Sequence, residues 1–145
     1  MPGLRALDKY AVQVGGGVNH RMGLYDAVMI KDNHLLAGMS IPDAVAAARE
    51  KVGHGVEITV EVESLEQLRE VLDTDADRVL LDNMSPVLLA EAVVLIGGRI
   101  VAEASGGVDL ENVRAVATSG VDVISVGWIT HSAPQLDVAL DFQSR

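Results

Sequence analysis

Strand-like and helix-like patterns alternate along this 145-residue chain, and the alternation constrains its fold more than any other feature. Short runs rich in Val, Ile and Leu are each followed by a segment whose apolar residues recur every three or four positions. Strands are expected at residues 26–32, 56–63, 78–82, 99–107 and 121–127. Helices are expected at residues 2–17, 40–53, 64–73, 85–98 and 109–120, with a polar loop and then a helix in the tail, 129–142. This order predicts a single α/β domain over residues 1–145, with a parallel sheet and right-handed crossovers.

Local signals support several of these boundaries. Ser40 and Ser64 stand where helix N-caps are needed, Gln67 has capping-box spacing behind Ser64, and Pro86 falls in the first turn of its helix. The run 26–32 is continuously apolar at its centre, which is typical of a strand buried on both faces. An open doubly wound sheet and a closed (β/α) barrel both fit the pattern. Five strands are too few for a complete barrel of about 250 residues, so a barrel would be incomplete.

Charge and composition exclude several classes of partner. The formal net charge of −10 disfavours nucleic acids and anionic membranes, since both need a cationic surface. Residues 1–34 carry four basic and three acidic side chains, so an anionic ligand would be bound in that part of the chain. No apolar run approaches the roughly 18 residues of a membrane span. The chain has no cysteine and no signal-peptide pattern, and we expect a cytoplasmic protein.

Polar residues stand at the carboxyl ends of the expected strands. Lys31, Glu61 and Asp82 each follow an apolar run, and Glu103 and Gly127 do so in the last two strands. Ligands of parallel α/β folds lie at this edge, so the first three side chains are expected to face a common space. A lysine there suits contact with a phosphate or carboxylate. The two carboxylates could bind ribose hydroxyls, hold Mg²⁺, or stabilise a developing positive charge.

Two glycine-containing loops follow the last two strands. The segment 105–109, SGGVD, with Ser105, Gly106 and Gly107, is expected to lead straight into a helix, where glycine amides can bind a phosphate. The segment 125–132, SVGWITHS, offers a second such loop with Gly127 and His131. Phosphate sites built from the last two loops are common in barrel enzymes.

A third polar group follows the triple glycine at 15–17. His20 and Arg21 are neighbours there, and an imidazole beside a guanidinium suits contact with an anion. The chain lacks both cysteine and an HxxxH pattern, which disfavours a zinc site.

The motifs taken together resemble the quinolinate phosphoribosyltransferase family. The resemblance rests on PGLRALDKYAVQVGGGVNHRMGLYDAVMIKDNH, VEVESLEQL, LLDNMSP, EASGGV and GVDVISVGWITHS, in the order and spacing of that family. It runs over essentially the whole chain, and the combination of motifs is highly specific.

The resemblance implies an enzyme that joins quinolinate to phosphoribosyl pyrophosphate with Mg²⁺. Nicotinate mononucleotide, pyrophosphate and CO₂ would be the products, in the de novo synthesis of NAD. By the family's motifs, His20, Arg21 and Lys31 would contact the carboxylates of quinolinate or the pyrophosphate. Glu61 and Asp82 would hold the ribose hydroxyls and Mg²⁺, and Lys31 would join them as the catalytic set. The 5′-phosphate would be bound by Ser105, Gly106, Gly107, Gly127 and His131.

The resemblance also implies parts that this chain lacks. The family has an N-terminal α/β sandwich and an incomplete α/β barrel, and its dimers share active sites. Met1 stands where a Thr-Arg-Lys-Thr strand is usual, so we expect the first barrel strand and the sandwich to be missing. The exposed sheet edge left behind predicts a homo-oligomer. Two alternatives stay open: an inactive fragment that binds phosphate or assembles with a separate N-terminal half, and the family's molybdenum-associated paralogue.

Overall fold

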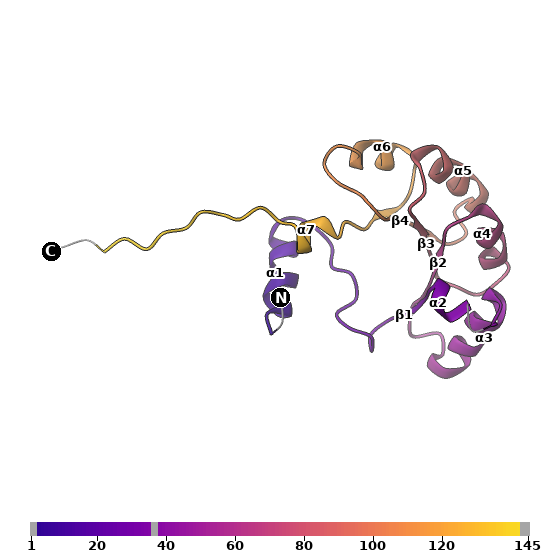
Figure 1. The fold of residues 1–145 in the computed structure, drawn as a ribbon. Coiled ribbons are helices and arrows are strands. Elements are labelled where there is room, and N and C mark those ends of the chain that lie inside the picture. Colours follow the sequence, from indigo (N-terminus) through magenta and orange to yellow (C-terminus); the bar gives the residue numbers. More distant parts are fainter. Residues whose placement is uncertain (1–2, 36–37, 143–145) are drawn as a thin grey trace.

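The computed structural model describes residues 3–35 and 38–142, and it contains a five-stranded parallel sheet (Figure 1). The strands are β1 (Val28–Ile30), β2 (Ile58–Val62), β3 (Arg78–Asp82), β4 (Val101–Ser105) and β5 (Val123–Ile124). The helices are α1 (Arg5–Val14), α2 (Asp32–Leu35), α3 (Ile41–Val52), α4 (Leu65–Leu72), α5 (Pro86–Ile96), α6 (Val113–Thr118) and α7 (Trp128–His131). The expected alternation of strands and helices is confirmed.

The order of the strands decides between the two architectures that fit the sequence. In a doubly wound sheet the order reverses at a switch point, and helices cover both faces. Here the order is β1-β2-β3-β4-β5 without reversal, and α3 to α6 lie on the convex side of a curved sheet (Figure 1). The structure is therefore an arc of an α/β barrel, as expected, and β1 and β5 form its edges in the part of the chain described.

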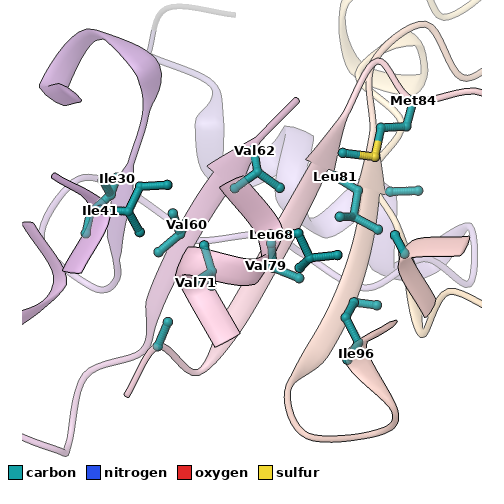
Figure 2. Packing of buried hydrophobic residues seen from close by; sticks show 14 of the residues in the cluster. Ile30, Ile41, Val60, Val62, Leu68, Val71, Val79, Leu81, Met84 and Ile96 are labelled. Carbon is teal, nitrogen blue, oxygen red and sulfur yellow. The ribbon is translucent and has the colours of Figure 1, made fainter. Parts of the chain in front are cut away.

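The outer, helix-facing side of the sheet is the hydrophobic core. Val60 pairs with Val79 and Leu81 with Ala104, which places alternate residues of neighbouring strands on the same side. Figure 2 shows Leu68 and Val71 of α4 packed against this side. Burying such side chains provides the main driving force for the fold, at about 1.5–3 kcal/mol for each large one.

The inner side of the sheet is polar. Glu61 pairs with Leu80, which in turn pairs with Glu103, so these three residues form one row across β2, β3 and β4. Leu80 is buried but does not belong to the hydrophobic cluster under the helices. The expectation that the strand at 26–32 is buried on both faces was wrong, because helices cover only one face of the sheet. Val28 and Met29 are only partly buried.

The N-caps expected from the sequence are confirmed. The side-chain oxygen of Ser40 accepts a hydrogen bond from the backbone N–H of Asp43 at 3.2 Å, and Ser64 accepts one from Gln67 at 3.2 Å. The side chain of Gln67 reaches back to accept from the N–H of Glu63 at 2.8 Å. No helix within the described ranges is long and apolar enough to cross a membrane.

The tail differs from the expectation. Residues 133–142 form no helix and extend away from the sheet (Figure 1), whereas the polar loop expected to begin at residue 129 falls in the short helix α7. The exposed apolar residues of the tail are Leu136, Val138, Leu140 and Phe142. They recur at every second position, which is the period of an extended segment, and an isolated helix of this length is marginal in water.

A buried arginine joins the opposite, amino-terminal ends of two strands. The guanidinium of Arg49 in α3 binds Asp75 at 3.1 Å and Asp77 at 2.7 Å, and it donates to the carbonyl oxygen of Val56 at 3.0 Å. Asp77 also accepts from the N–H of Ile58 at the start of β2, at 2.8 Å. Burial alone would raise the pKa of Asp77, but the hydrogen bonds from Arg49 and Ile58 outweigh it and lower the pKa.

Replacing this arginine should destabilise the sheet. In Arg49→Met the apolar stem stays, but the hydrogen bonds of the guanidinium to the loops before β2 and β3 are lost. We expect the midpoint of thermal unfolding to fall by about 5 °C, measured by circular dichroism. Arg69→Met is the matched control, since among the described residues Arg69 makes only an exposed ion pair with Glu66 at 4.0 Å. Equal shifts in the two variants would contradict the role of Arg49.

The lowered pKa of Asp77 predicts a pH dependence. Its folded-state pKa lies below the ordinary value of about 3.9, so its stabilising effect is present above that pH and is lost as the pH falls through the folded-state value. Unfolding midpoints of the wild type and Asp77→Asn should therefore differ most near neutral pH and converge in acid. A difference that stays constant down to about pH 3 would show that the charge of Asp77 contributes nothing.

Candidate active site

Two of the residues expected to face a common space are in direct contact. Lys31 follows β1, and its Nζ donates a hydrogen bond to Oε2 of Glu61 in β2. The side chain of Lys31 is 42% exposed and that of Glu61 is 13% exposed. The backbone N–H of Lys31 donates to Nδ1 of His34 in α2, at 2.9 Å. The lysine is thus held at the mouth of the inner face, within reach of a ligand.

Asp82 is the last residue of β3 and lies on the same side of the sheet as Glu61. It is partly buried, and its Oδ2 accepts a hydrogen bond from the side-chain amide of Asn83 at 2.6 Å. Asn83 has a left-handed backbone, with φ of 53°, and its N–H donates to the carbonyl oxygen of Ser105 at 2.9 Å. Asp82 also pairs with Ser105 in the sheet register. The LDN and SGG motifs are therefore in direct contact at the carboxyl ends of β3 and β4, and we call this contact the Asp82–Ser105 joint.

Gly106 makes this joint possible. Its φ is +90°, and a Cβ at this position would lie 2.3 Å from Oδ1 and 2.8 Å from the backbone nitrogen of Asn83. Gly107 also has a positive φ, +59°, but a Cβ there would meet nothing within 4 Å. The expectation that this segment leads straight into a helix was wrong. Residues 108–112 intervene before α6, and the side chain of Asn112 holds that loop by donating to the carbonyl oxygen of Gly107 at 2.8 Å.

The loop after β5 matches its expectation more closely. Gly127 directly precedes α7, and its carbonyl oxygen accepts hydrogen bonds from the backbone N–H groups of Thr130 at 3.0 Å and His131 at 3.1 Å. The imidazole of His131 is exposed and lies beside Gly127, where a Cβ would be 3.2 Å from Nε2. A small exposed loop with a histidine at its end is open to a ligand.

The loop that carries His20 and Arg21 is held from two sides. Nζ of Lys9 in α1 donates to the carbonyl oxygens of His20 at 2.6 Å and Arg21 at 3.0 Å. The guanidinium of Arg21 donates to the carbonyl oxygen of Ala27 at 3.2 Å. On the other side, Nε2 of His20 lies 3.6 Å from Oε1 of Glu103. This contact brings the loop against the inner face of the sheet.

The sequence led us to expect Glu103 at the carboxyl end of its strand and gave it no role, but it lies at the centre of that face. Glu103 is 0% exposed and lies inside β4 rather than at its end. Nη1 of Arg78 donates to it at 2.9 Å, and the hydroxyl of Ser125 donates to its other oxygen. Burial would lower the pKa of Arg78, but the hydrogen bonds to Glu103 and Glu57 outweigh it and raise that pKa. The sequence VAEAS could have indicated this position. The charge of Glu103 stands between two buried alanines, so in a strand it must point to the opposite face from theirs.

Two hollows of the surface lie away from this row of charges. A cavity of about 610 Å³ lies between α5 and α6 and includes Val87, Val94 and Ala115, on the helical side of the sheet. A second, of about 410 Å³, lies beside Arg5 and Arg21. The outer groove is lined mostly by apolar side chains, whereas the charged side chains gather on the inner face. Within the described ranges no three His, Asp or Glu side chains are grouped to hold a metal ion.

Comparison with known proteins gives a consistent result. A family model described as "Quinolinate phosphoribosyl transferase, C-terminal domain" matches residues 1–141. A probable nicotinate-nucleotide pyrophosphorylase [carboxylating] of Bacillus subtilis is 49% identical over 140 residues, which cover 97% of this chain and 48% of that protein. The corresponding enzyme of Mycobacterium leprae is 47% identical over 145 residues, covering 97% of this chain and 50% of that protein.

Solved structures agree. NadC from Streptococcus pyogenes superimposes with a TM-score of 0.87 at 43% identity, covering 94% of this chain and 48% of that one. A thiamine phosphate pyrophosphorylase from Pyrococcus furiosus, at 22% identity and a TM-score of 0.59, shares the fold. The chain thus spans about half the length of the relatives that it matches.

The contrast between the two glycines gives a test of the joint at Asp82. Gly107→Ala should cost about 1 kcal/mol of unfolding free energy, from its left-handed backbone alone. Gly106→Ala should cost about 3 kcal/mol, because the new methyl group must also displace Asn83. Chemical denaturation measures both, and the amide signal of Asn83 in a ¹H–¹⁵N spectrum should shift only in Gly106→Ala. Similar costs for the two variants would refute the close approach.

Proposed function

This chain belongs to the family of quinolinate phosphoribosyl transferase C-terminal domains, and on that premise we propose that it supplies the catalytic face of such an enzyme. The reaction transfers the phosphoribosyl group of phosphoribosyl pyrophosphate to the ring nitrogen of quinolinate. Loss of one carboxyl group as CO₂ then leaves nicotinate mononucleotide. The observation that carries the proposal is the row of charged side chains on the inner face, in which Lys31 contacts Glu61 and Asp82 closes the next strand.

Anion-binding groups surround this row, as two anionic substrates require. His20, Arg21 and Lys31 would contact the carboxylates of quinolinate or the pyrophosphate. The support is that Lys31 is 42% exposed at the mouth of the face and that His20 and Arg21 share one anchored loop. Ser105, Gly106, Gly107, Gly127 and His131 would bind the 5′-phosphate, on the two loops that follow β4 and β5.

The carboxylates suit the charge that develops during the transfer. As the bond between the anomeric carbon and pyrophosphate breaks and the bond to the ring nitrogen forms, the ribose gains positive charge. Glu61 and Asp82 lie on adjacent strands, where they can stabilise that charge and bind the ribose hydroxyls. The nitrogen is then quaternary, so the ring accepts the electron pair left by CO₂, and a proton replaces the lost carboxyl group.

Mg²⁺ fits this site as a partner of the substrate. Magnesium is commonly held by one or two carboxylates together with the phosphates of its substrate, and it keeps several waters. Asp82 is partly buried and Glu61 is 13% exposed, so both can present an oxygen to such an ion. The ion would neutralise charge on the departing pyrophosphate.

Additional cations from another chain complete the proposal. On the inner face, Lys31 and Arg78 already contact Glu61 and Glu103. Phosphoribosyl pyrophosphate and quinolinate together bring several negative charges to a chain with a net charge of −10. We therefore propose that a second copy, or a separate N-terminal half, contributes basic side chains, so that the active form is an oligomer.

The test is product formation. The purified chain is mixed with quinolinate, phosphoribosyl pyrophosphate and Mg²⁺, alone and together with the N-terminal half of the Bacillus subtilis relative, and nicotinate mononucleotide is quantified. We expect turnover at least in the second mixture. Lys31→Ala should lower kcat/KM by about 100-fold, as loss of a charge-stabilising contact does in other enzymes.

Lys51→Ala is the matched control, since Lys51 is an exposed lysine of α3 that lies away from the inner face. It should leave kcat/KM unchanged. Absence of nicotinate mononucleotide in both mixtures would contradict the proposed activity of this chain. An equal loss in the two lysine variants would contradict the role of Lys31.

A further inference from the structure

We infer that Glu103 is a positioning residue that aligns the two substrate-binding loops of the site. This inference rests on the proposed function, in which His20 contacts the carboxylates of quinolinate or the pyrophosphate and the loop after Ser125 binds the 5′-phosphate. Glu103 itself is 0% exposed and touches no open space, so it acts through its neighbours. No step of the proposed reaction uses it.

Glu103 contacts three different segments of the chain. Its Oε2 accepts a hydrogen bond from Nη1 of Arg78 in β3 at 2.9 Å. Its Oε1 accepts one from the hydroxyl of Ser125 and lies 3.6 Å from Nε2 of His20. One oxygen is therefore fixed by the neighbouring strand, and the other faces both loops at once. A side chain in this position sets the distance between those loops.

The geometry of His20 shows what the carboxylate does for the imidazole. Nδ1 of His20 accepts a hydrogen bond from the N–H of Arg21 at 2.8 Å, so Nδ1 carries no proton in this arrangement. The proton of the neutral ring is then on Nε2, which points toward Oε1 of Glu103. At 3.6 Å this is an electrostatic contact rather than a hydrogen bond. It reinforces the tautomer that the N–H of Arg21 favours, and it orients the ring toward the sheet.

The same oxygen holds the start of the phosphate-side loop. Ser125 follows β5, and its N–H donates to the carbonyl oxygen of Ala104 at 2.9 Å while its hydroxyl donates to Glu103. Both ends of this residue are thereby tied to β4. Gly127 follows two residues later and α7 begins at the next residue, so a displacement of Ser125 would move the whole phosphate-side loop.

Arg78 explains why a carboxylate rather than an amide is needed. Arg78 has only N–H donors, so whichever side chain stands at 103 must turn an oxygen toward it. A carboxylate has a second oxygen for His20 and Ser125. A glutamine would instead present its NH₂ group to Nε2–H of His20, and two donors would face each other.

The decisive variant is Glu103→Gln, and its matched control is Glu57→Gln. Glu57 is the other partner of Arg78, with Nη2 to Oε2 at 3.1 Å, but it is exposed and contacts neither His20 nor Ser125 among the described interactions. The control therefore removes a charge from the same arginine without touching the two loops.

The first measurement needs no turnover. The ¹⁵N signals of the imidazole of His20, assigned by comparison with His20→Gln, report which ring nitrogen carries the proton. The wild type and Glu57→Gln should both show a protonated Nε2 and an unprotonated Nδ1 in the neutral ring. In Glu103→Gln we expect a mixture of tautomers. Because the readout is spectroscopic, it tests the positioning even if the chain proves inactive.

The second measurement uses the mixture that forms nicotinate mononucleotide. Glu103→Gln should lower kcat/KM by about tenfold or more, since small misplacements of binding groups have effects of that size, and KM should rise for both substrates. Glu57→Gln should stay within about twofold of the wild type. A wild type without activity would refute the proposed function alone, since the tautomer measurement still decides the role of Glu103.

Should Glu103→Gln fail to fold, Glu103→Asp decides. Aspartate keeps the charge near Arg78 but is one methylene shorter, so it should withdraw from His20 and again mix the tautomers. The inference is overturned if the signals of His20 are the same in the wild type and in each folded variant at 103. It is equally overturned if Glu57→Gln changes them to the same degree.

Discussion

The one-sided covering of the sheet is the constraint on which the rest of this structure depends. Side chains of a strand alternate between its two faces, and helices α3 to α6 cover only the outer one. The outer face must therefore be apolar, as Val60, Val79 and Leu81 are. The inner face is free to carry charge: Lys31 and Glu61 keep contact with solvent there, and the buried Glu103 is compensated by Arg78.

Most helices and strands could be predicted from the sequence, because caps and apolar spacing agree with the packing of each element in the folded structure. Helix α4 illustrates this: Ser64 caps it, Gln67 completes the cap, and its apolar residues at helical spacing meet β2. The prediction of a helix in the tail was wrong because no long-range contact supports the local pattern there. A helix there would have needed a surface to pack against, and Phe142 is 91% exposed. Pattern alone does not supply such a surface.

The site was predictable in part for a similar reason. Lys31, Glu61 and Asp82 could be placed because topology alone brings the carboxyl ends of parallel strands together, and their chemical roles stay predictions. The position of Glu103 inside its strand and its role could not be predicted, because its neighbours in sequence reveal an alternation but not which face lies open. Its contacts come from Arg78, Ser125 and His20, which are distant in the sequence. Only the folded structure brings them together.

The ion pairs of Arg49 at the amino-terminal edge of the sheet have a consequence for how such a fold can change. Arg49 and Asp77 tie β2 to β3 at the edge opposite to the one where Lys31 and Asp82 lie. Stability and ligand chemistry are thus assigned to different ends of the same strands. Loops at the carboxyl edge can be exchanged for others while the anchor below stays intact, which makes this half-barrel a suitable starting point for engineering new substrate preferences.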